Sequence, residues 1–271
     1  MSNPGLDYDL IADVYDDRYR GGRRKGISGI LRKYSGEKSI GRILEVGCGT
    51  GAWLDEIDAA HKSPRLHGLD ISRQMLLAAR RKNQQLVLVN GSAGFLPYAT
   101  GTFDLVICLN AIHHFPHPDD FIIDAGRILD EDGRIMVIGM DPHANDTHWY
   151  LYDYFESIRQ TDLNRFPATV QVCDWLESAG FNQIAHREID RVVENFSGSE
   201  VLANPFLQKS MCSQLALLSD EAYQAGLNLI HLKIEEAEKT GVPAKFEVSI
   251  GMDLITGIKV KRNAQHVMRK I

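Results

Sequence analysis

The sequence predicts an α/β fold in which helices cover both faces of a doubly wound, mainly parallel seven-stranded sheet. Between residues 37 and 140, short apolar runs alternate with patterns of helical period. The run Phe103–Leu109 is almost continuously apolar, as expected of a strand buried on both faces. Alternate glycines follow the first run and precede a helical pattern. Parallel strands joined by right-handed helical crossovers explain all of these observations.

The N-terminal part of the chain carries two helical patterns. In residues 6–20, Leu10, Ile11 and Val14 recur at helical spacing among tyrosines, and Gly21-Gly22 ends the pattern. A second amphipathic pattern begins at Ile27 and ends near Gly36. We expect both helices to precede the main fold.

The strands and helices of the core then alternate in order. The expected strands are Ile43–Val46, Arg65–Ile71, Leu86–Val89, Phe103–Leu109 and Arg134–Ile138. The expected helices are Ala52–Ala60, a helix with Ser72 as its N-cap, and Phe121–Leu129, with Asp132-Gly133 as a turn. In such a sheet, ligands bind at the carboxyl ends of the strands.

Beyond Gly139 the alternation is less regular. Helices are expected at Trp149–Gln160, at Thr169–Ala179 with Gly180 as its stop, and in a stretch that starts at Ser219. The last two strands are Asn182–Ile189 and Lys245–Ile258. The connection between them, on the order of 55 residues, is too long for a loop and predicts a helical cap.

The predicted organisation has six segments. They are an N-terminal helical lid (1–36), a cofactor-binding core (37–140), a helical cap insert (141–168), a core helix and strand (169–190), a second helical cap insert (191–244) and a C-terminal segment (245–271) whose strand completes the core.

Composition favours a soluble globular protein that binds a small molecule. The chain has 271 residues, 44% hydrophobic and 24% charged residues, and a net charge of −6, which gives no field to attract nucleic acid. A basic run at residues 18–25 is better explained as a solvated helix face and turn than as a nucleic-acid patch. No apolar run reaches the ~18 residues of a membrane span, and the polar start lacks the apolar core of a signal peptide. We expect a cytoplasmic protein.

The four cysteines, Cys48, Cys108, Cys173 and Cys212, are scattered and have no CxxC spacing. This pattern suggests neither a disulfide framework nor a zinc site. We expect reduced, mostly packed thiols and no metal.

The glycine loop fits two classes of ligand. Glycines remove the Cβ atoms that would keep a ligand away from backbone N–H groups, and the helix behind the loop adds unpaired donors. Gly47-x-Gly49-x-x-Ala52 satisfies the alanine variant of the dinucleotide fingerprint, and Asp70 lies where a ribose-binding acid is expected. An NAD(P)-dependent oxidoreductase is therefore one alternative. Glu45 and Gly51 are not part of that fingerprint.

Four motifs in succession resemble those of the class I S-adenosylmethionine-dependent methyltransferases, in the small-molecule branch of type 11/25. They are Glu45-x-Gly47-x-Gly49-x-Gly51, Gly68-Leu69-Asp70-Ile71-Ser72 with Met75-Leu76, the loop Gly91 to Tyr98, and Phe103-Asp104-Leu105-Val106 through His113-His114-Phe115. The resemblance implies a Rossmann-like methyltransferase fold with S-adenosylmethionine as cofactor.

The resemblance also implies a cofactor site. The implied contacts are the loop around Cys48 with Gly47, Gly49 and Gly51 at the methionine end, Glu45 at the cofactor ammonium, Asp70 at the ribose hydroxyls, Ile71 and Met75 at the adenine face, Ser92 and Ala93 in the adenine loop, and Asn110 after the fourth strand. The family often has an acidic residue where this chain has Ser92, which leaves the Ala93 N–H as the expected contact. Tyr8 and Tyr15 lie in a segment that closes over the cofactor in relatives.

Several of these residues also have an alternative interpretation in which their role is purely structural. Asp70 could cap the following turn, and Ile71 and Met75 could be plain core residues. The N-terminal tyrosines could pack on the core with their hydroxyls in water.

The run His113-His114-Phe115-Pro116-His117 could suggest a base or a metal site. Adjacent histidines point in different directions, and no acidic or cysteine partner stands at metal-ligand spacing except Asp119 and Asp120 in the next helix's first turn. We interpret His114, and with less support His113, as candidate general bases, the alternative being a packed, hydrogen-bonded histidine.

The predicted reaction is methyl transfer to a small molecule by in-line displacement, which gives S-adenosylhomocysteine. Because the sulfonium is already activated, positioning the acceptor can supply much of the catalysis. Asn110-Ala111-Ile112-His113 replaces the turn typical of nucleic-acid amine methylases, which together with the acidic net charge favours a small molecule over nucleic acid. No membrane partner is expected. The candidate acceptor residues are Asp141, His143, Trp149 and Tyr152. A protein that binds the cofactor without methylating is a further alternative, and the oligomeric state is not predicted.

Overall fold

The computed structural model describes residues 8–12, 15–16, 25–61 and 64–260. Their strands are β1 (Arg42–Val46), β2 (Arg65–Asp70), β3 (Val87–Asn90), β4 (Phe103–Leu109), β5 (Leu129–Gly139), β6 (His148–Trp149), β7 (Phe181–Ser197) and β8 (Lys245–Lys259). The α-helices are α1 (Tyr8–Ile11), α2 (Lys25–Ser35), α3 (Ala52–Ala60), α4 (Arg73–Lys82), α5 (Pro118–Ile128), α6 (Leu151–Tyr154), α7 (Ile158–Arg165), α8 (Thr169–Ser178), α9 (Ser213–Ala216) and α10 (Asp220–Thr240). Short 3-10 helices are η2 (Ile112–His114), η3 (Gly198–Ala203) and η4 (Pro205–Leu207).

The strands form one mixed sheet in the order β3-β2-β1-β4-β5-β8-β6, and β7 pairs with the other side of β8. The pairs among β1 to β5 are parallel, whereas β8 runs antiparallel to β5, β6 and β7. This arrangement confirms the predicted doubly wound, mainly parallel sheet. The two-residue β6 is an additional strand beyond the seven that the sequence predicts.

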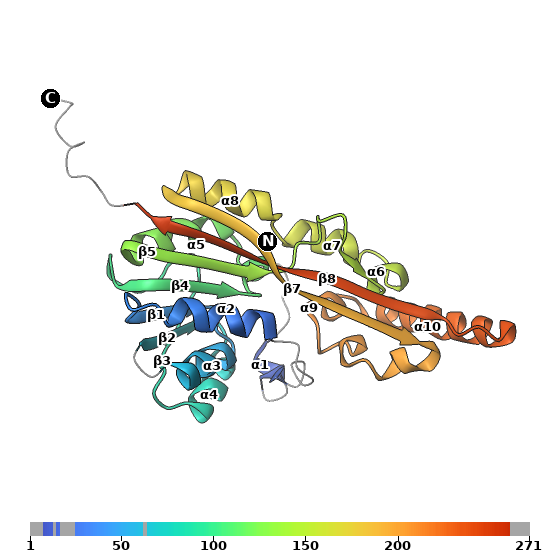
Figure 1. The fold of residues 1–271 in the computed structure, drawn as a ribbon. Helices are drawn as coiled ribbons and strands as arrows, with labels where there is room; N and C mark the ends of the chain where they lie inside the picture. The colour runs from blue at the N-terminus through green and yellow to red at the C-terminus, as the bar shows by residue number, and fades with distance from the viewer. Residues whose placement is uncertain (1–7, 13–14, 17–24, 62–63, 261–271) are drawn as a thin grey trace.

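Helices cover both faces of the sheet, as Figure 1 shows. On one face, Ile27 and Leu31 of α2 and Leu54 of α3 pack against the strands, and on the other Phe121 of α5 and Leu176 of α8 do so. The chain leaves β1 toward β2 and β3 and returns to the opposite side of β1 as β4. The order therefore reverses between β1 and β4, where open α/β sheets bind their ligands.

A long antiparallel ribbon, β7 and β8, extends past the carboxyl edge of the parallel strands and carries α9 and α10 beyond it (Figure 1). A third apolar cluster lies there and includes Trp149, Tyr150, Phe155, Ile230 and Phe246. The segment 198–244 thus packs as a helical unit on the ribbon, as the length of the connection predicts.

Three local predictions are wrong in part. The turn at Asp132-Gly133 lies inside β5, where Asp132 has φ 62° and the register with β4 shifts. The helix predicted for residues 149–160 starts with the β6 residue Trp149 and is then divided into α6 and α7 at Ser157, whose φ is 68°. Residues 191–197, predicted to start the second cap insert, continue β7 because they pair with β8.

Some sequence predictions fall on residues outside the described ranges. They are the Gly21-Gly22 break and most of the basic run at residues 18–25, together with residues 261–271 of the last predicted segment. Within the described residues, no helix has both the length and the apolarity needed to cross a membrane.

Candidate functional site

The glycine loop between β1 and α3 takes a backbone path that favours glycine. Gly47, Gly49 and Gly51 have φ values of 74°, 52° and 71°, in the left-handed region. The N–H groups of Gly47 and Cys48 donate to the carbonyl oxygen of Leu69 at 2.8 and 3.1 Å, which fixes the loop to the end of β2. A Cβ at Gly47 would lie 2.4 Å from the Cβ of Ala111.

Asp70, the last residue of β2, lies directly beneath this loop. Its carboxylate accepts hydrogen bonds from the N–H of Gly49 at 2.7 Å and from the N–H of Ser72 at 2.8 Å. Burial raises the pKa of Asp70, and these backbone hydrogen bonds oppose that rise. Asp70 therefore caps the turn and also faces a cavity, which is described next. A capping role and a ligand-binding role for Asp70 are thus compatible.

A cavity of about 110 Å³ opens at the point where the strand order reverses. It brings together most of the residues predicted to hold the cofactor, namely Tyr8, Tyr15, Gly47, Gly49, Asp70, Ile71, Met75, Ser92, Ala93 and Asn110. Ile71 is 76% exposed, whereas Met75 beside it is 1% exposed. An exposed isoleucine at the rim of a polar loop provides an apolar surface that a flat ring can cover.

Three predicted cofactor residues, Glu45, Cys48 and Gly51, do not line this cavity. Cys48 is buried, and a Cβ at Gly68 would lie 2.7 Å from its sulfur, so the thiol faces the core. A Cβ at Gly51 would lie 3.1 to 3.2 Å from Leu86 and Ala79, so helix packing, together with its positive φ, explains this glycine. Glu45 lies within β1 and is 1% exposed. The pKa of the Cys48 thiol is raised chiefly by burial, then by the charge of Asp70, and then by the charge of Glu45.

The N-terminal segment is fixed over the glycine loop at two points. Asp9 accepts hydrogen bonds from the Ser72 hydroxyl at 2.5 Å and from the Gln74 N–H at 3.2 Å, at the start of α4. Asp16 accepts a hydrogen bond from the Thr50 hydroxyl at 2.6 Å and pairs with Lys82. These contacts hold Tyr8 and Tyr15 at the cavity wall.

The paired histidines lie in different environments. The Tyr8 hydroxyl lies 2.6 Å from Nε2 of His114, within hydrogen-bond distance. The His113 ring stacks on Phe166 with ring centres 3.8 Å apart, and burial, then His114 and Arg165, lower its pKa well below the usual range. His114 lines both the smaller cavity and a larger cavity that adjoins it. Of these two cavities, His113 lines only the larger one.

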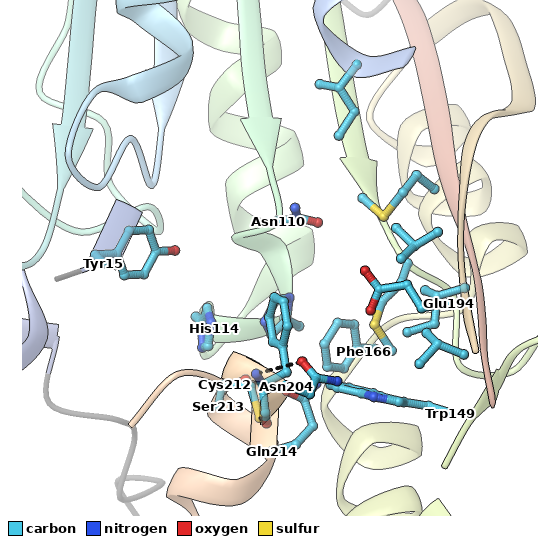
Figure 2. A pocket seen from close by; sticks show the side chains of 18 of the residues that line it. Tyr15, Asn110, His114, Trp149, Phe166, Glu194, Asn204, Cys212, Ser213 and Gln214 are labelled. Atoms are coloured by element: carbon cyan, nitrogen blue, oxygen red, sulfur yellow. Dashed lines mark hydrogen bonds between the residues drawn. The ribbon is translucent and has the colours of Figure 1, made fainter. Parts of the chain in front are cut away.

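A larger cavity, of about 190 Å³, adjoins the first, and Figure 2 shows its side chains. Tyr8, Tyr15, Asn110 and His114 line both cavities. The rest of the wall is mainly aromatic and aliphatic and comes from the sheet, the β7–β8 ribbon and the cap. It comprises Ile27, Trp53, His113, Met140, Trp149, Phe166, Val192, Glu194, Asn204, Phe206, Cys212, Ser213, Gln214, Val248, Ile250 and Met252.

Of the four predicted acceptor residues, only Trp149 lines this larger cavity. Asp141 accepts hydrogen bonds from the N–H groups of His143 and Thr169, each at 2.8 Å, so it caps a turn and the start of α8. His143 Nε2 lies 3.0 Å from the carbonyl oxygen of Phe166. Tyr152 donates to the buried Asp162 at 2.9 Å, in a polar network behind the cavity wall. The structure therefore gives these three residues structural contacts away from the cavity.

The sequence interpretation missed the polar residues that the cap and ribbon bring to the cavity, namely Glu194, Asn204, Ser213 and Gln214. They lie within the segment predicted as cap, where neither periodicity nor a motif separates cavity-facing positions from others. The strand alternation of residues 192, 194 and 196 could have pointed to Glu194, had the strand been predicted to continue past residue 190.

The described residues contain no group of three His, Cys, Asp or Glu side chains placed to hold a metal ion. Asp119 and Asp120 lie in the first turn of α5, where carboxylates favour the helix dipole.

Comparison with known proteins identifies the fold and a methyltransferase domain within it. A family model described as a methyltransferase domain matches residues 43–133, from β1 through the glycine loop into β5. The demethylmenaquinone methyltransferase of Bacillus licheniformis is 26% identical over 168 residues, which cover 60% of this chain and 72% of that protein. Other curated relatives match over a smaller share of their length, such as 47% of the phthiotriol/phenolphthiotriol dimycocerosates methyltransferase of Mycobacterium leprae.

Solved structures show the same fold. The YcgJ protein of Bacillus subtilis superposes with a TM-score of 0.59 at 18% identity, over 86% of this chain and 98% of that chain. The phosphoethanolamine N-methyltransferase 2 of Haemonchus contortus, in complex with S-adenosyl-L-methionine, superposes with a TM-score of 0.58 at 18% identity, over 93% of this chain and 57% of that chain. These findings do not favour the oxidoreductase alternative. Residues 43–133 of the chain thus match a methyltransferase domain, and the chain is similar in sequence and fold to methyltransferases, one of them solved with S-adenosyl-L-methionine.

Proposed function

We propose that this enzyme transfers a methyl group from S-adenosylmethionine, bound in the smaller cavity, to a small molecule bound in the larger one. The observation that carries this proposal is that the two cavities share Tyr8, Tyr15, Asn110 and His114. A donor and an acceptor on either side of this shared wall can be aligned for in-line displacement, with S-adenosylhomocysteine as the product. Alignment of this kind can contribute about 7–11 kcal/mol to lowering a barrier.

The proposed cofactor contacts follow from the walls of the smaller cavity. The backbone of Gly47 and Gly49 and the backbone of Asn110 are assigned to the methionine end, and the Asp70 carboxylate to the ribose hydroxyls. Ile71 and Met75 are assigned to one adenine face, and the loop at Ser92 and Ala93 to its edge. Glu45 lies behind this wall and is assigned an electrostatic role toward the cofactor ammonium, because a buried carboxylate nearby favours a cation.

Between the two histidines, we assign the general base to His114. It lies at the shared wall, and its hydrogen-bonding partner Tyr8 belongs to the N-terminal segment. His113 is stacked, and its lowered pKa keeps it neutral, so it is assigned a packing role. A base is required only if the accepting atom is a hydroxyl or an acidic carbon.

A small-molecule acceptor is supported by the cavity and by the relatives. The relatives' names refer to demethylmenaquinone and phosphoethanolamine, both small molecules. The net charge of −6 disfavours a polyanionic partner. That the acceptor is not a nucleic acid stays a prediction. The cytoplasmic location also stays a prediction.

Isothermal titration with S-adenosylhomocysteine tests the cofactor site. We expect binding to the wild-type chain and a loss of at least about tenfold in affinity for Asp70→Ala, since the carboxylate then offers the ribose no acceptor. The matched control is Asp174→Ala, an exposed carboxylate on α8, which should bind normally. Tight binding of NADH without binding of S-adenosylhomocysteine would overturn the proposal.

Turnover separates an enzyme from a protein that only binds the cofactor. Incubation with labelled S-adenosylmethionine and a panel of small metabolites should transfer label to at least one of them. Tyr8→Phe and His114→Gln should lower kcat for a hydroxyl acceptor more than they change cofactor affinity. Equal activity of both variants and the wild type would contradict the base assigned to His114.

A further inference from the structure

Asn110 has an unusual backbone conformation at the point where the two cavities meet. Its φ is 50°, in the left-handed region, and among the described non-glycine residues with positive φ it is the one that lines either cavity. Its N–H donates to the carbonyl oxygen of Ile138 at 2.8 Å, which fixes the residue to β5 just before the chain turns into η2. Asparagine tolerates this conformation better than most residues, but glycine adopts it without steric cost. A backbone contact with the cofactor therefore does not explain why a side chain stands here.

The Asn110 side chain differs from the other two side-chain amides of the larger cavity. Within the described part of the chain, the Asn110 carboxamide makes no hydrogen bond, and it is partly exposed. Asn204 donates to the Tyr150 hydroxyl at 3.0 Å, and its side chain is buried. Gln214 donates to Asp162 at 3.0 Å and is also buried. The amide of Asn110 is thus the one that a ligand can reach without breaking a hydrogen bond of the fold.

This amide lies beside the base assigned above. Asn110 and His114 both line the smaller and the larger cavity. Figure 2 shows the Asn110 side chain at the end of its strand, above His114 in this view and with Tyr15 to one side. A group bound by Asn110 from the larger cavity is therefore close to the shared wall.

The wall of the larger cavity limits the chemistry of that group. Most of the wall is aromatic or aliphatic, and none of the described residues that line it is Lys or Arg. An anionic group would lose its hydration here without gaining a lysine or arginine partner, whereas a neutral group needs only a hydrogen bond. A hydroxyl requires a base during methyl transfer and a neutral amine does not, so His114 beside Asn110 favours a hydroxyl.

We infer that the Asn110 side chain donates a hydrogen bond to the hydroxyl oxygen of an uncharged, largely apolar acceptor and orients this oxygen toward the smaller cavity. The inference rests on the proposed function, and it adds the class of the accepting group and the residue that orients it. One lone pair of the oxygen accepts the Asn110 N–H, and the hydroxyl proton passes to His114. A second lone pair forms the O–C bond while the C–S bond breaks and leaves its electron pair on sulfur. Because hydrogen bonds to charged oxygen are stronger, the amide stabilises the oxygen as its proton leaves.

The ionisation of bound 4-nitrophenol tests this inference, because the phenol and the phenolate absorb at different wavelengths. The probe is titrated with pH on the full chain saturated with S-adenosylhomocysteine, and its absorbance gives the pKa of the bound hydroxyl. In Asn110→Gly, which keeps the left-handed backbone without strain, we expect that pKa to be higher by about 1, because the phenolate loses a donor. Asn110→Asp should raise it further, since a carboxylate repels the phenolate. The affinity of Asn110→Gly for S-adenosylhomocysteine should stay close to that of the wild type.

Asn228→Asp is the matched control, because Asn228 is exposed on α10 and does not line the cavity. It makes the same change in net charge as Asn110→Asp and should leave the pKa of the bound probe unchanged. The titratable residues of the cavity wall are common to all variants, so differences report on residue 110; they are Tyr8, Tyr15, His113, His114, Glu194 and Cys212.

An equal or lower pKa of the bound probe in Asn110→Gly than in the wild type would overturn the inference. The absence of 4-nitrophenol binding to the wild type would overturn it as well. Loss of probe binding in Asn110→Gly alone, with S-adenosylhomocysteine affinity retained, would support it. Failure of S-adenosylhomocysteine to bind the wild type would instead refute the proposed function.

Discussion

At the scale of single residues, the three loop glycines are required for different reasons. All have positive φ, but an added Cβ meets different atoms at each. At Gly47 it would collide with Ala111 at the wall of the smaller cavity, and at Gly51 it would press on Leu86 and Ala79. At Gly49 the nearest atom belongs to Tyr15, 3.8 Å away. One sequence motif therefore combines a ligand-facing requirement with a packing requirement.

Gly47→Ala should destabilise the protein by about 2 kcal/mol or more, because it adds left-handed strain to a steric clash. Cofactor affinity should fall as well. The control is Gly29→Ala in α2, where φ is ordinary helical, no atom lies within 4 Å of the new Cβ, and the position is exposed. That variant should gain about 0.5–1 kcal/mol from helix propensity. Urea unfolding measures both, and a neutral Gly47→Ala would show that the loop can relax.

At the scale of elements, the cap is held by close packing and by one buried polar network. Asp162 of α7 is fully buried, and it accepts hydrogen bonds from Tyr152, Arg165 and Gln214. Burial raises the pKa of Asp162, while Arg165 and these donors oppose the rise. The network joins α6, α7 and α9 directly behind Ser213 and Gln214, so it fixes part of the wall of the larger cavity.

The contact of α10 with α6 depends on Gly226. A Cβ there would lie 2.2 Å from the Phe155 ring, and Phe155 is 1% exposed at the end of α6. Gly226→Ala should therefore cost about 1–3 kcal/mol of stability by overpacking. Protease sensitivity should rise within 198–244, whereas S-adenosylhomocysteine affinity should stay close to that of the wild type. Ala225→Ser, at the exposed neighbouring position, is the control. Unchanged stability of Gly226→Ala would mean that α10 shifts freely on α6.

At the scale of the whole molecule, two partly buried histidines couple folding to pH. The pKa of His113 is lowered well below 6.5 by burial, His114 and Arg165, and the pKa of His67 is lowered by burial, Arg65 and Arg42. Below pH 6.5 the unfolded chain binds protons at these sites and the native chain resists them. The free energy of unfolding should therefore fall as the pH falls through this range.

His113 alone should contribute up to about 1.4 kcal/mol per pH unit below about pH 6.5. His113→Phe keeps an aromatic ring against Phe166 but cannot take up a proton. Urea unfolding at pH 7.5 and 5.5 should show a smaller loss of stability for this variant than for the wild type. The contribution of His67 is common to both proteins and cancels. Equal losses would mean that His113 is protonated in the native state.

The elements with strong local signals could be predicted from the sequence. The continuous apolar run of β4, Ser72 as the N-cap of α4 and Gly180 after α8 each depend on interactions within a few residues. The division of the predicted helix 149–160 could not be predicted. Trp149 pairs with Val248 and so belongs to the sheet, and Ser157, between α6 and α7, has a left-handed conformation. Long-range pairing overrode a helical pattern there.

The sequence by itself determined most of the wall of the smaller cavity. The glycine loop, Asp70 and the motifs that follow succeed one another within residues 45–115, and parallel pairing of the strands that precede them brings them to one edge of the sheet. Only the tertiary structure decided the wall of the larger cavity. Its wall combines the N-terminal segment, the β7–β8 ribbon and the cap, and pairing of both Glu194 and Trp149 with Val248, on opposite sides of β8, joins segments that lie far apart in the chain. Contacts between distant segments leave no periodic signal in the sequence, so these residues could be found only in the fold.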